Sequence, residues 1–295
     1  MPDTNKHGLG RYIPEEIRYE VRRKCRFGCV VCGAVPYEYH HFKTPFAEAL
    51  SHDPDDIILL CDSHHRQAGT ILQNDWLDLA KTQRSEAQEA RFKLPGTSRD
   101  FKVRWPSVQL DATKNSVVVN GESILSVVAQ DNALEPVLLS GVFSSRDGVE
   151  ICRIENNAII SRVSNLGDFK IISNRFTYRN AKGEEDLAFT LDNSGIAVDR
   201  IYHVHGGVAI FGNDRCFRIH DGEKLIDVTG TRSVKSEVAI EVKSAGYFDY
   251  TGVDLENMRV NARIRGEITE DNRAGISIDT NGSGLRITGM HFGSR

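Results

Sequence analysis

The sequence has 295 residues, enough for one large domain or two of ordinary size. Its net charge of −4 and pI near 6.2 exclude a protein-wide basic field, so contact with nucleic acid would need a local patch. No stretch approaches the roughly 20 apolar residues that span a bilayer, and the first residues lack the apolar segment of a secretory signal. We therefore expect a cytoplasmic protein with reduced thiols and no membrane partner.

A cluster near the N-terminus is the only dense basic patch. Residues 1–95 hold 13 Lys and Arg against 14 Asp and Glu, and the remaining residues hold 24 against 27, so neither part is basic as a whole. The cluster comprises Arg18, Arg22, Arg23, Lys24 and Arg26. It is either the solvated face of a helix or a surface that contacts the phosphates of a nucleic acid.

Residues 11–25 predict the first helix. Pro14 suits the first helical position, and the two glutamates after it favour the positive end of the helix dipole. Ile17, Val21 and Cys25 fall four residues apart and form the expected buried stripe.

Short elements follow this helix. The aromatic residues of 36–42 predict a strand, residues 55–61 are a second short apolar run, and a short helix comes next. Residues 74–92 predict a further helix with Asn74 as its N-cap. Its expected inward face consists of Trp76, Leu79 and Ala80.

The pattern changes after residue 100. Short apolar runs recur there, separated by Gly, Asn and Asp at intervals of roughly 8–12 residues, which is typical of an all-β sandwich or barrel. A β-helix is the alternative. We therefore predict an α+β chain: a loose tail at 1–10, a small domain at 11–93, a linker at 94–100 and a β-rich region at 101–295. That region is one domain or two, divided at about residue 230.

Four of the six cysteines lie between residues 25 and 61, which in a reducing compartment points to metal. Cys29 and Cys32 form C-x2-C, and Cys61 and His64 form C-x2-H after 28 intervening residues. Such a Cys3His set binds structural zinc (Zn²⁺) in a closed shell that stabilises the fold without doing chemistry. In small zinc peptides this binding contributes about 10–16 kcal/mol. The alternatives are a set of reduced core cysteines without metal, and Cys25 in place of Cys29.

His40, His41 and His65 remain without a structural task. Neutral imidazoles bind a divalent ion, and another imidazole near its ordinary pKa takes a proton from water. The three residues therefore suit one-metal hydrolysis of a phosphodiester.

The stretch from Arg11 to about Leu79 resembles the HNH endonucleases, which have the ββα-metal fold. The motifs that match in order and spacing are CVVC at 29–32, the His pair at 40–41, DIILLC at 56–61 and DSHH at 62–65. The resemblance covers about a quarter of the chain. It implies a metal-dependent endonuclease acting on DNA, most simply double-stranded DNA.

The resemblance also implies a role for each matching residue. His41 corresponds to the general base, and His40 and His65 correspond to ligands of a catalytic Mg²⁺ or Mn²⁺. Asp56 stands where the family usually has Asn, which braces the loop and orients the base; an Asp lacks the amide donor but keeps two acceptor oxygens. Ala68 stands near the position where many members of the family have Lys. Arg66 would then make the phosphate contact of that missing Lys.

The expected nucleic-acid contacts are Arg22, Arg23, Lys24, Arg26 and Arg66. Two other functions stay open. One is a catalytically silent zinc module whose β region binds a partner protein, and the other is an RNA-directed nuclease or toxin. Fusion of such a nuclease to a sensor or adaptor domain resembles the effectors of prokaryotic anti-phage defence, by analogy of fold alone.

Other candidates lie outside these motifs. His52 is either a solvated loop residue or a further group near the site. His203 and His205 share a strand face, as two metal ligands or as its wet side, and Cys152 and Cys216 are expected in the core. The β region has no catalytic motif, but the aromatic segment 246–252 suggests a contact surface. We expect the β region to bind a regulatory partner, a ligand or a second copy of the chain.

Overall fold

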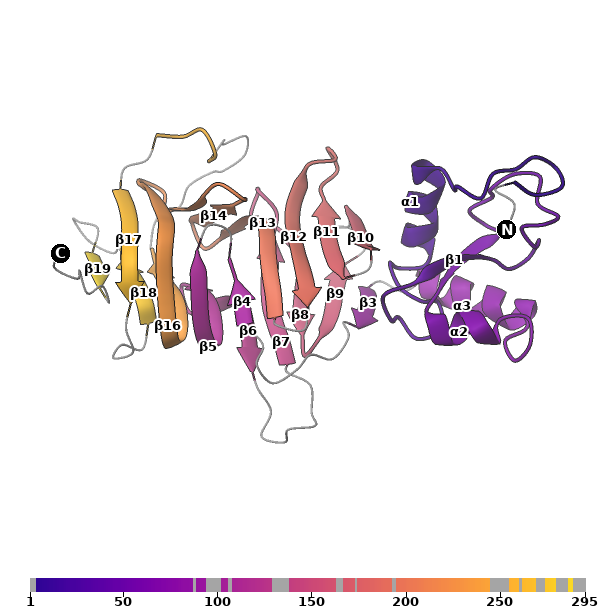
Figure 1. Ribbon diagram of the computed structural model, residues 1–295, viewed down its shortest axis with the longest axis horizontal. Helices are drawn as coiled ribbons and strands as arrows, with labels where there is room; N and C mark the ends of the chain where they lie inside the picture. Colours follow the sequence, from indigo (N-terminus) through magenta and orange to yellow (C-terminus); the bar gives the residue numbers. More distant parts are fainter. Residues whose placement is uncertain are drawn as a thin grey trace. The chain divides into compact units, whose positions relative to one another are not determined.

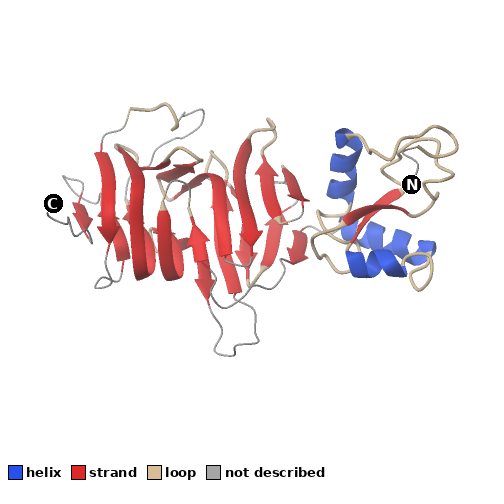
Figure 2. Ribbon diagram, viewed as in Figure 1, coloured by secondary structure: helices blue, strands red, loops and turns tan. Residues whose placement is uncertain are grey.

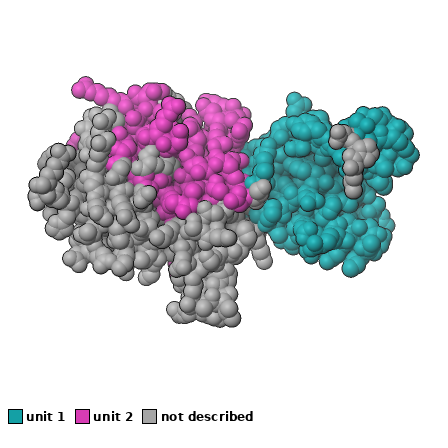
Figure 3. Space-filling model, viewed as in Figure 1, with its two compact units in different colours: residues 1–95, 158–173 teal, residues 96–157, 174–295 magenta. Residues whose placement is uncertain are grey.

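The computed structural model describes residues 4–86, 89–93, 102–105, 108–128, 138–162, 167–172, 174–192, 195–244, 255–259, 262–268, 274–279 and 286–288. The chain divides into two compact units (Figure 3). Unit 1 consists of residues 1–95 and 158–173, and unit 2 consists of residues 96–157 and 174–295. The expected linker at 94–100 and the aromatic segment at 246–252 lie outside the described residues.

Unit 1 combines helices with short strands (Figure 2). Its elements are α1 (Glu15–Lys24), β1 (Glu38–His41), β2 (Ile57–Leu60), α2 (Asp62–Gln67), α3 (Asn74–Glu86), β3 (Glu89–Lys93), β9 (Ala158–Arg162) and β10 (Asp168–Ile172). β1 and β2 pair antiparallel, as do β3 and β9. α1 packs against α3 and β2, and α2 packs against β1 and β2 (Figure 1).

The core of unit 1 forms around β2. All four residues of this strand, Ile57–Leu60, are fully buried, because helices and β1 cover the strand. Val21 and Cys25 of the first helical segment are also fully buried, and Ile17 packs against the same cluster, so the predicted stripe is confirmed. Acidic residues lie in the first turn of α1 and basic residues in its last turn, as the helix dipole favours.

The predicted inward face of α3 is wrong. Trp76 is 45% exposed and Leu79 is 55% exposed, whereas Leu77 and Lys81 are buried. The side chain of Lys81 explains this orientation: its ammonium donates to the backbone carbonyls of Pro54, Asp55 and Ile57 at 2.8–3.0 Å. The buried face thus contains a lysine, which hydrophobicity alone assigns to the surface.

Part of the expected N-terminal tail is ordered. Thr4 forms a bridge with Gly10, and Asn5 Nδ2 donates to the carbonyls of Phe46 and Ala49 at 2.7 Å. These hydrogen bonds satisfy polar groups of a loop that the sequence pattern leaves unpaired. From Thr4 onward the segment is therefore a turn fastened to the loop after β1.

All elements of unit 2 in the part of the chain that the structure describes are strands. They are β4 (Lys102–Arg104), β5 (Gln109–Val119), β6 (Glu122–Val128), β7 (Leu138–Ser144), β8 (Glu150–Glu155), β11 (Arg175–Arg179), β12 (Glu185–Asp192), β13 (Gly195–His205), β14 (Val208–Gly212), β15 (Phe217–His220), β16 (Leu225–Lys243), β17 (Ala262–Ile268), β18 (Ala274–Asp279) and β19 (Arg286–Thr288). β5 to β8 pair in sequence as an antiparallel run, and so do β11 to β16.

The long strand β16 joins these two runs. Its first residues pair with β15 and β17, and its last residues pair with β5 and β18, the contacts with β5, β17 and β18 being parallel. The described strands of unit 2 therefore form a mixed sheet and no closed barrel, which corrects the barrel alternative. The mixed α+β character, with strands predominating, is confirmed. Among the described helices, none has the length and apolar character needed to cross a membrane.

Candidate functional site

Cys29, Cys32, Cys61 and His64 form a cluster that could hold a metal ion, as predicted. Their ligand atoms all lie within 4.8 Å of one another. Cys32 Sγ lies 3.8 Å from Cys61 Sγ, and His64 Nδ1 lies 3.4 Å from Cys29 Sγ and 3.2 Å from Cys61 Sγ. A tetrahedron with bonds of about 2.0–2.3 Å places neighbouring ligand atoms roughly 3.3–3.8 Å apart, and these three separations lie within or close to that range, so the set could hold zinc.

Local backbone structure positions these ligands. Cys29 and Cys32 lie in a tight turn in which the Gly33 amide donates to the Cys29 carbonyl at 2.8 Å. Gly33 has a φ of +74°, and a Cβ atom on Gly28 would lie 2.6 Å from the Gly33 carbonyl oxygen, so both positions require glycine. Cys61 directly follows β2, and His64 lies in the first turn of α2.

Cys25 stays outside this cluster. Its side chain is fully buried in the core of unit 1, and burial raises the pKa of its thiol to about 11. It is thus a packed, protonated thiol, and the alternative in which it replaces Cys29 is not supported among the described residues.

His40 and His65 meet beside this cluster. Their rings are perpendicular, with centroids 4.9 Å apart, although one residue lies on β1 and the other on α2. His65 Nδ1 also lies 3.6 Å from Glu38 Oε2. Burial, together with the neighbouring His65 and His41, lowers the pKa of His40 to about 4. His40 is therefore a neutral imidazole at neutral pH, the form that binds a metal ion.

His41, the last residue of β1, has different neighbours. Its Nε2 lies 3.2 Å from His52 Nδ1, and His52 Nε2 lies 2.9 Å from the carbonyl oxygen of Gly10. The ring of Phe46 packs against both imidazoles, with centroids 5.6 Å from His41 and 6.3 Å from His52. Burial and the nearby His52 lower the pKa of His41, and the Asp56 carboxylate partly opposes them.

Asp56 braces the turn that follows His41. Its Oδ1 accepts a hydrogen bond from the Thr44 amide at 2.8 Å, and its backbone carbonyl accepts one from the Phe42 amide at 3.1 Å. A carboxylate oxygen thus makes an acceptor contact that an amide oxygen would also make.

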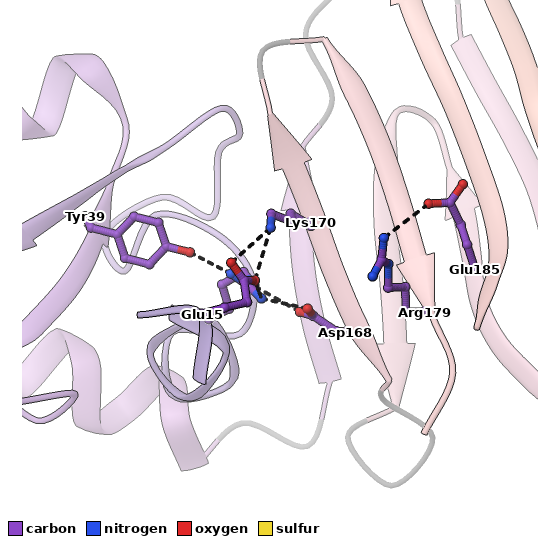
Figure 4. Close-up of polar contacts among 7 residues, drawn as sticks. Glu15, Tyr39, Asp168, Lys170, Arg179 and Glu185 are labelled. Carbon is purple, nitrogen blue, oxygen red and sulfur yellow. Dashed lines mark hydrogen bonds and ion pairs between the residues drawn. The ribbon is translucent and has the colours of Figure 1, made fainter. Parts of the chain in front are cut away.

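Arg22 does not lie on an exposed basic surface, contrary to the sequence prediction. Its side chain is 0% exposed and donates to both oxygens of Asp168, at 2.9 and 2.6 Å. It also donates to Glu15 and Tyr39 at 2.9 Å. Figure 4 shows these partners converging from α1, β1 and β10. Arg22 can be buried because the carboxylates of Glu15 and Asp168 compensate its charge, and Asp168 lies 146 positions further along the chain.

The other predicted basic contacts differ in exposure. Arg23 lies over the ring of Tyr19, Lys24 pairs with Glu20 and Asp55, and Arg26 donates to the carbonyls of Arg84 and Ser85. Arg66 is 72% exposed and pairs with Asp62 in the same helix.

His203 does not lie on the wet side of its strand, whereas the side chain of His205 is 29% exposed. His203 is fully buried, its Nδ1 accepts the Ser144 amide at 2.9 Å, and burial next to His205 lowers its pKa to about 3. His205 pairs with Glu122 at 2.8 Å. Cys152 and Cys216 are buried as expected.

Sequence reasoning missed the contacts made by Gly10, Glu38 and Asp168. The Gly10 contact uses a backbone carbonyl, which no residue pattern reveals, and Asp168 lies in a strand-rich region without a motif. For His52 the sequence left two alternatives, a solvated loop residue or a further group near the site, and its contact with His41 agrees with the second. Comparison of the chain with protein-family models, with curated proteins and with solved structures finds no match.

Proposed function

We propose that the first unit is a metal-dependent endonuclease of the HNH type that hydrolyses DNA phosphodiester bonds. The observation on which the proposal rests is the contact between the rings of His40 and His65. His65 directly follows His64, which belongs to the Cys3His cluster. The resemblance of the motif order pairs these same residues as ligands of one catalytic ion. This contact supports the proposal because the two rings come from different elements, the strand β1 and the helix α2, which meet only when the chain is folded.

In this proposal each histidine has its own task. His40 and His65 would hold Mg²⁺ or Mn²⁺, which as a Lewis acid stabilises charge on the phosphate. His41 takes a proton from the attacking water, and the water oxygen forms the new bond to phosphorus. The departing 3′ oxygen keeps the electron pair of the broken bond and takes a proton from solvent. Asp56 holds the turn after His41, and the Cys3His cluster holds structural zinc.

Cleavage of supercoiled plasmid by the zinc-loaded chain tests this proposal. With Mg²⁺ or Mn²⁺ present, His41→Ala should lower the cleavage rate by roughly 10²–10⁴-fold, because a general base contributes about that much. His65→Ala should raise the concentration of divalent ion that gives half-maximal rate. His7→Ala, an exposed histidine of the same unit, is the matched control and should leave the rate unchanged. Equal rates for the wild type and His41→Ala would contradict the proposal.

A second candidate is a zinc module without catalytic activity, with unit 2 as the part that binds a partner. The internal contacts of Arg22, Lys24 and Arg26 favour it, because a nuclease needs cations for the phosphates. A zinc-loaded wild type that cleaves neither DNA nor RNA with either ion would favour this candidate. A wild type that cleaves RNA alone would favour the RNA-directed nuclease.

A further inference from the structure

His52 makes contacts that the proposed reaction leaves unexplained. It lies in the loop between β1 and β2 and stands between two fixed groups, His41 Nε2 at 3.2 Å and the Gly10 carbonyl oxygen at 2.9 Å. The ring of Phe46 stacks on the imidazole of His52, at an interplanar angle of 12°, and contacts the imidazole of His41 edge-on. Together these contacts form a chain from a backbone carbonyl to the histidine at the end of β1.

The donors and acceptors in this chain follow from one fact. A carbonyl oxygen carries no proton, so His52 Nε2 must be the donor in its contact with Gly10. A neutral His52 then has its lone pair on Nδ1, and His41 Nε2 must donate to that lone pair. The lone pair of a neutral His41 is consequently on Nδ1. The Gly10 carbonyl thus determines the tautomers of both rings.

We propose that His52 is a positioning residue, which holds His41 in the Nε2-protonated tautomer and leaves His41 Nδ1 as the atom that accepts the proton of the attacking water. The tautomer assignment stands on geometry alone, and the catalytic consequence rests on the proposed nuclease function.

The N-terminal turn supplies the fixed end of this chain. Gly10 bridges to Thr4, and Asn5 fastens the turn to the carbonyls of Phe46 and Ala49, on the loop that also carries the ring packed against His52. Asn5 Oδ1 accepts the amide of Leu9 at 3.0 Å, next to Gly10. The carbonyl that determines the tautomers is therefore held by several hydrogen bonds.

Two substitutions separate positioning from simple packing. His52→Phe keeps an aromatic ring against Phe46 and removes the acceptor for His41 Nε2–H. His52→Asn loses the ring and keeps an acceptor oxygen two bonds from Cβ, where the histidine has Nδ1. If His52 positions the base, the Asn variant retains activity and the Phe variant loses it. If His52 only fills space, the order is reversed.

The experiment measures plasmid cleavage by the zinc-loaded full chain at saturating DNA and divalent ion. His52→Phe should lower this rate at least about 10-fold, part of the 10²–10⁴-fold contribution of a general base. The DNA concentration for half-maximal rate should stay the same, and His52→Asn should be closer to the wild type than His52→Phe. A wild-type rate in His52→Phe, or a lower rate in His52→Asn than in His52→Phe, would overturn the proposal.

Nitrogen-15 spectra of histidine-labelled protein give a readout that does not depend on activity. The ring nitrogen shifts should show neutral His41 with a protonated Nε2 in the wild type and in His52→Asn, and a mixture of tautomers in His52→Phe. A protonated Nδ1 on wild-type His41 would overturn the proposal. If the wild type cleaves no nucleic acid but shows the protonated Nε2, the nuclease function fails and the positioning by His52 stands.

Discussion

The buried guanidinium of Arg22 allows a stability prediction whose size follows from the structure. Asp168→Asn removes the negative charge that meets Arg22 at 2.6 Å, while the shape of the side chain is nearly preserved. Breaking a buried ion pair by removing one partner costs roughly 3–5 kcal/mol, because the remaining charge is buried without compensation. Glu15 and Tyr39 still accept hydrogen bonds from Arg22, so we expect a loss near the lower end, about 3 kcal/mol.

Removal of the other partner of this ion pair, Arg22, should lower the free energy of unfolding by less. Arg22→Met leaves Asp168 and Glu15, whose side chains are 22% and 48% exposed and can be hydrated. We expect a loss of about 1–2 kcal/mol, in the usual range for a single substitution. The double variant should therefore be more stable than Asp168→Asn alone, since it contains no uncompensated buried cation.

Urea unfolding of the zinc-loaded chain, followed by circular dichroism at the helical band, measures these losses. The helices of the described chain lie in unit 1, so this signal reports on the unit that contains Arg22. Asp78→Asn is the control within unit 1, because it breaks a pair with Lys43 in which the two side chains are 50% and 47% exposed, and it should cost less than about 1 kcal/mol. A loss for Asp168→Asn no larger than this control would refute the buried ion pair.

Three further predictions concern metal, pH and a buried lysine. Cys61→Ser, or removal of zinc by a chelator, should abolish the helical signal of unit 1, and metal analysis of the wild type should find about one zinc per chain; a folded metal-free protein would contradict the zinc site. Burial lowers the pKa of His203 to about 3, below the value of about 6.5 in the unfolded chain. Between pH 6.5 and 3 the unfolded chain therefore binds one more proton than the folded chain. The free energy of unfolding should fall by about 1.4 kcal/mol for each unit of falling pH in this range. His203→Asn should remove this slope in unfolding measurements across that range, and an unchanged slope would count against it. Lys81→Met should destabilise unit 1 by about 2–3 kcal/mol in the same urea assay, because carbonyls of Pro54, Asp55 and Ile57 lose their donor; a loss equal to that of exposed Thr82→Ala would argue against this contact.

Local sequence patterns predicted those parts of the molecule whose chemistry is local. C-x2-C and C-x2-H each close a short loop, so the ligand types and their spacing already define two halves of a metal cluster. The buried stripe of α1 follows from helical periodicity, because residues four apart lie on one face. The strand-rich character of unit 2 likewise follows from short apolar runs between turn residues.

His40, His41 and His65 show which contacts the local sequence pattern predicts and which it does not. The order of motifs led to the prediction that His40 and His65 act together, and the structure places their rings side by side. The partner of His41 depends instead on a loop and on a backbone carbonyl near the N-terminus. A backbone oxygen has the same chemistry at every position, so its participation becomes visible only when the chain is folded.

The burial of charged and titratable side chains was decided by tertiary structure alone. Arg22 lies in a run of basic residues that is typical of a surface, yet it is buried because Asp168 and Glu15 compensate its charge. Lys81 is buried where three backbone carbonyls accept hydrogen bonds from its ammonium, and His203 is buried where the Ser144 amide donates to its Nδ1. Transfer of a polar group from water is unfavourable unless partners meet it, and these partners are distant in sequence. The sequence by itself therefore determined which residues could form the Cys3His cluster, whereas the fold determined which charged side chains are exposed to solvent.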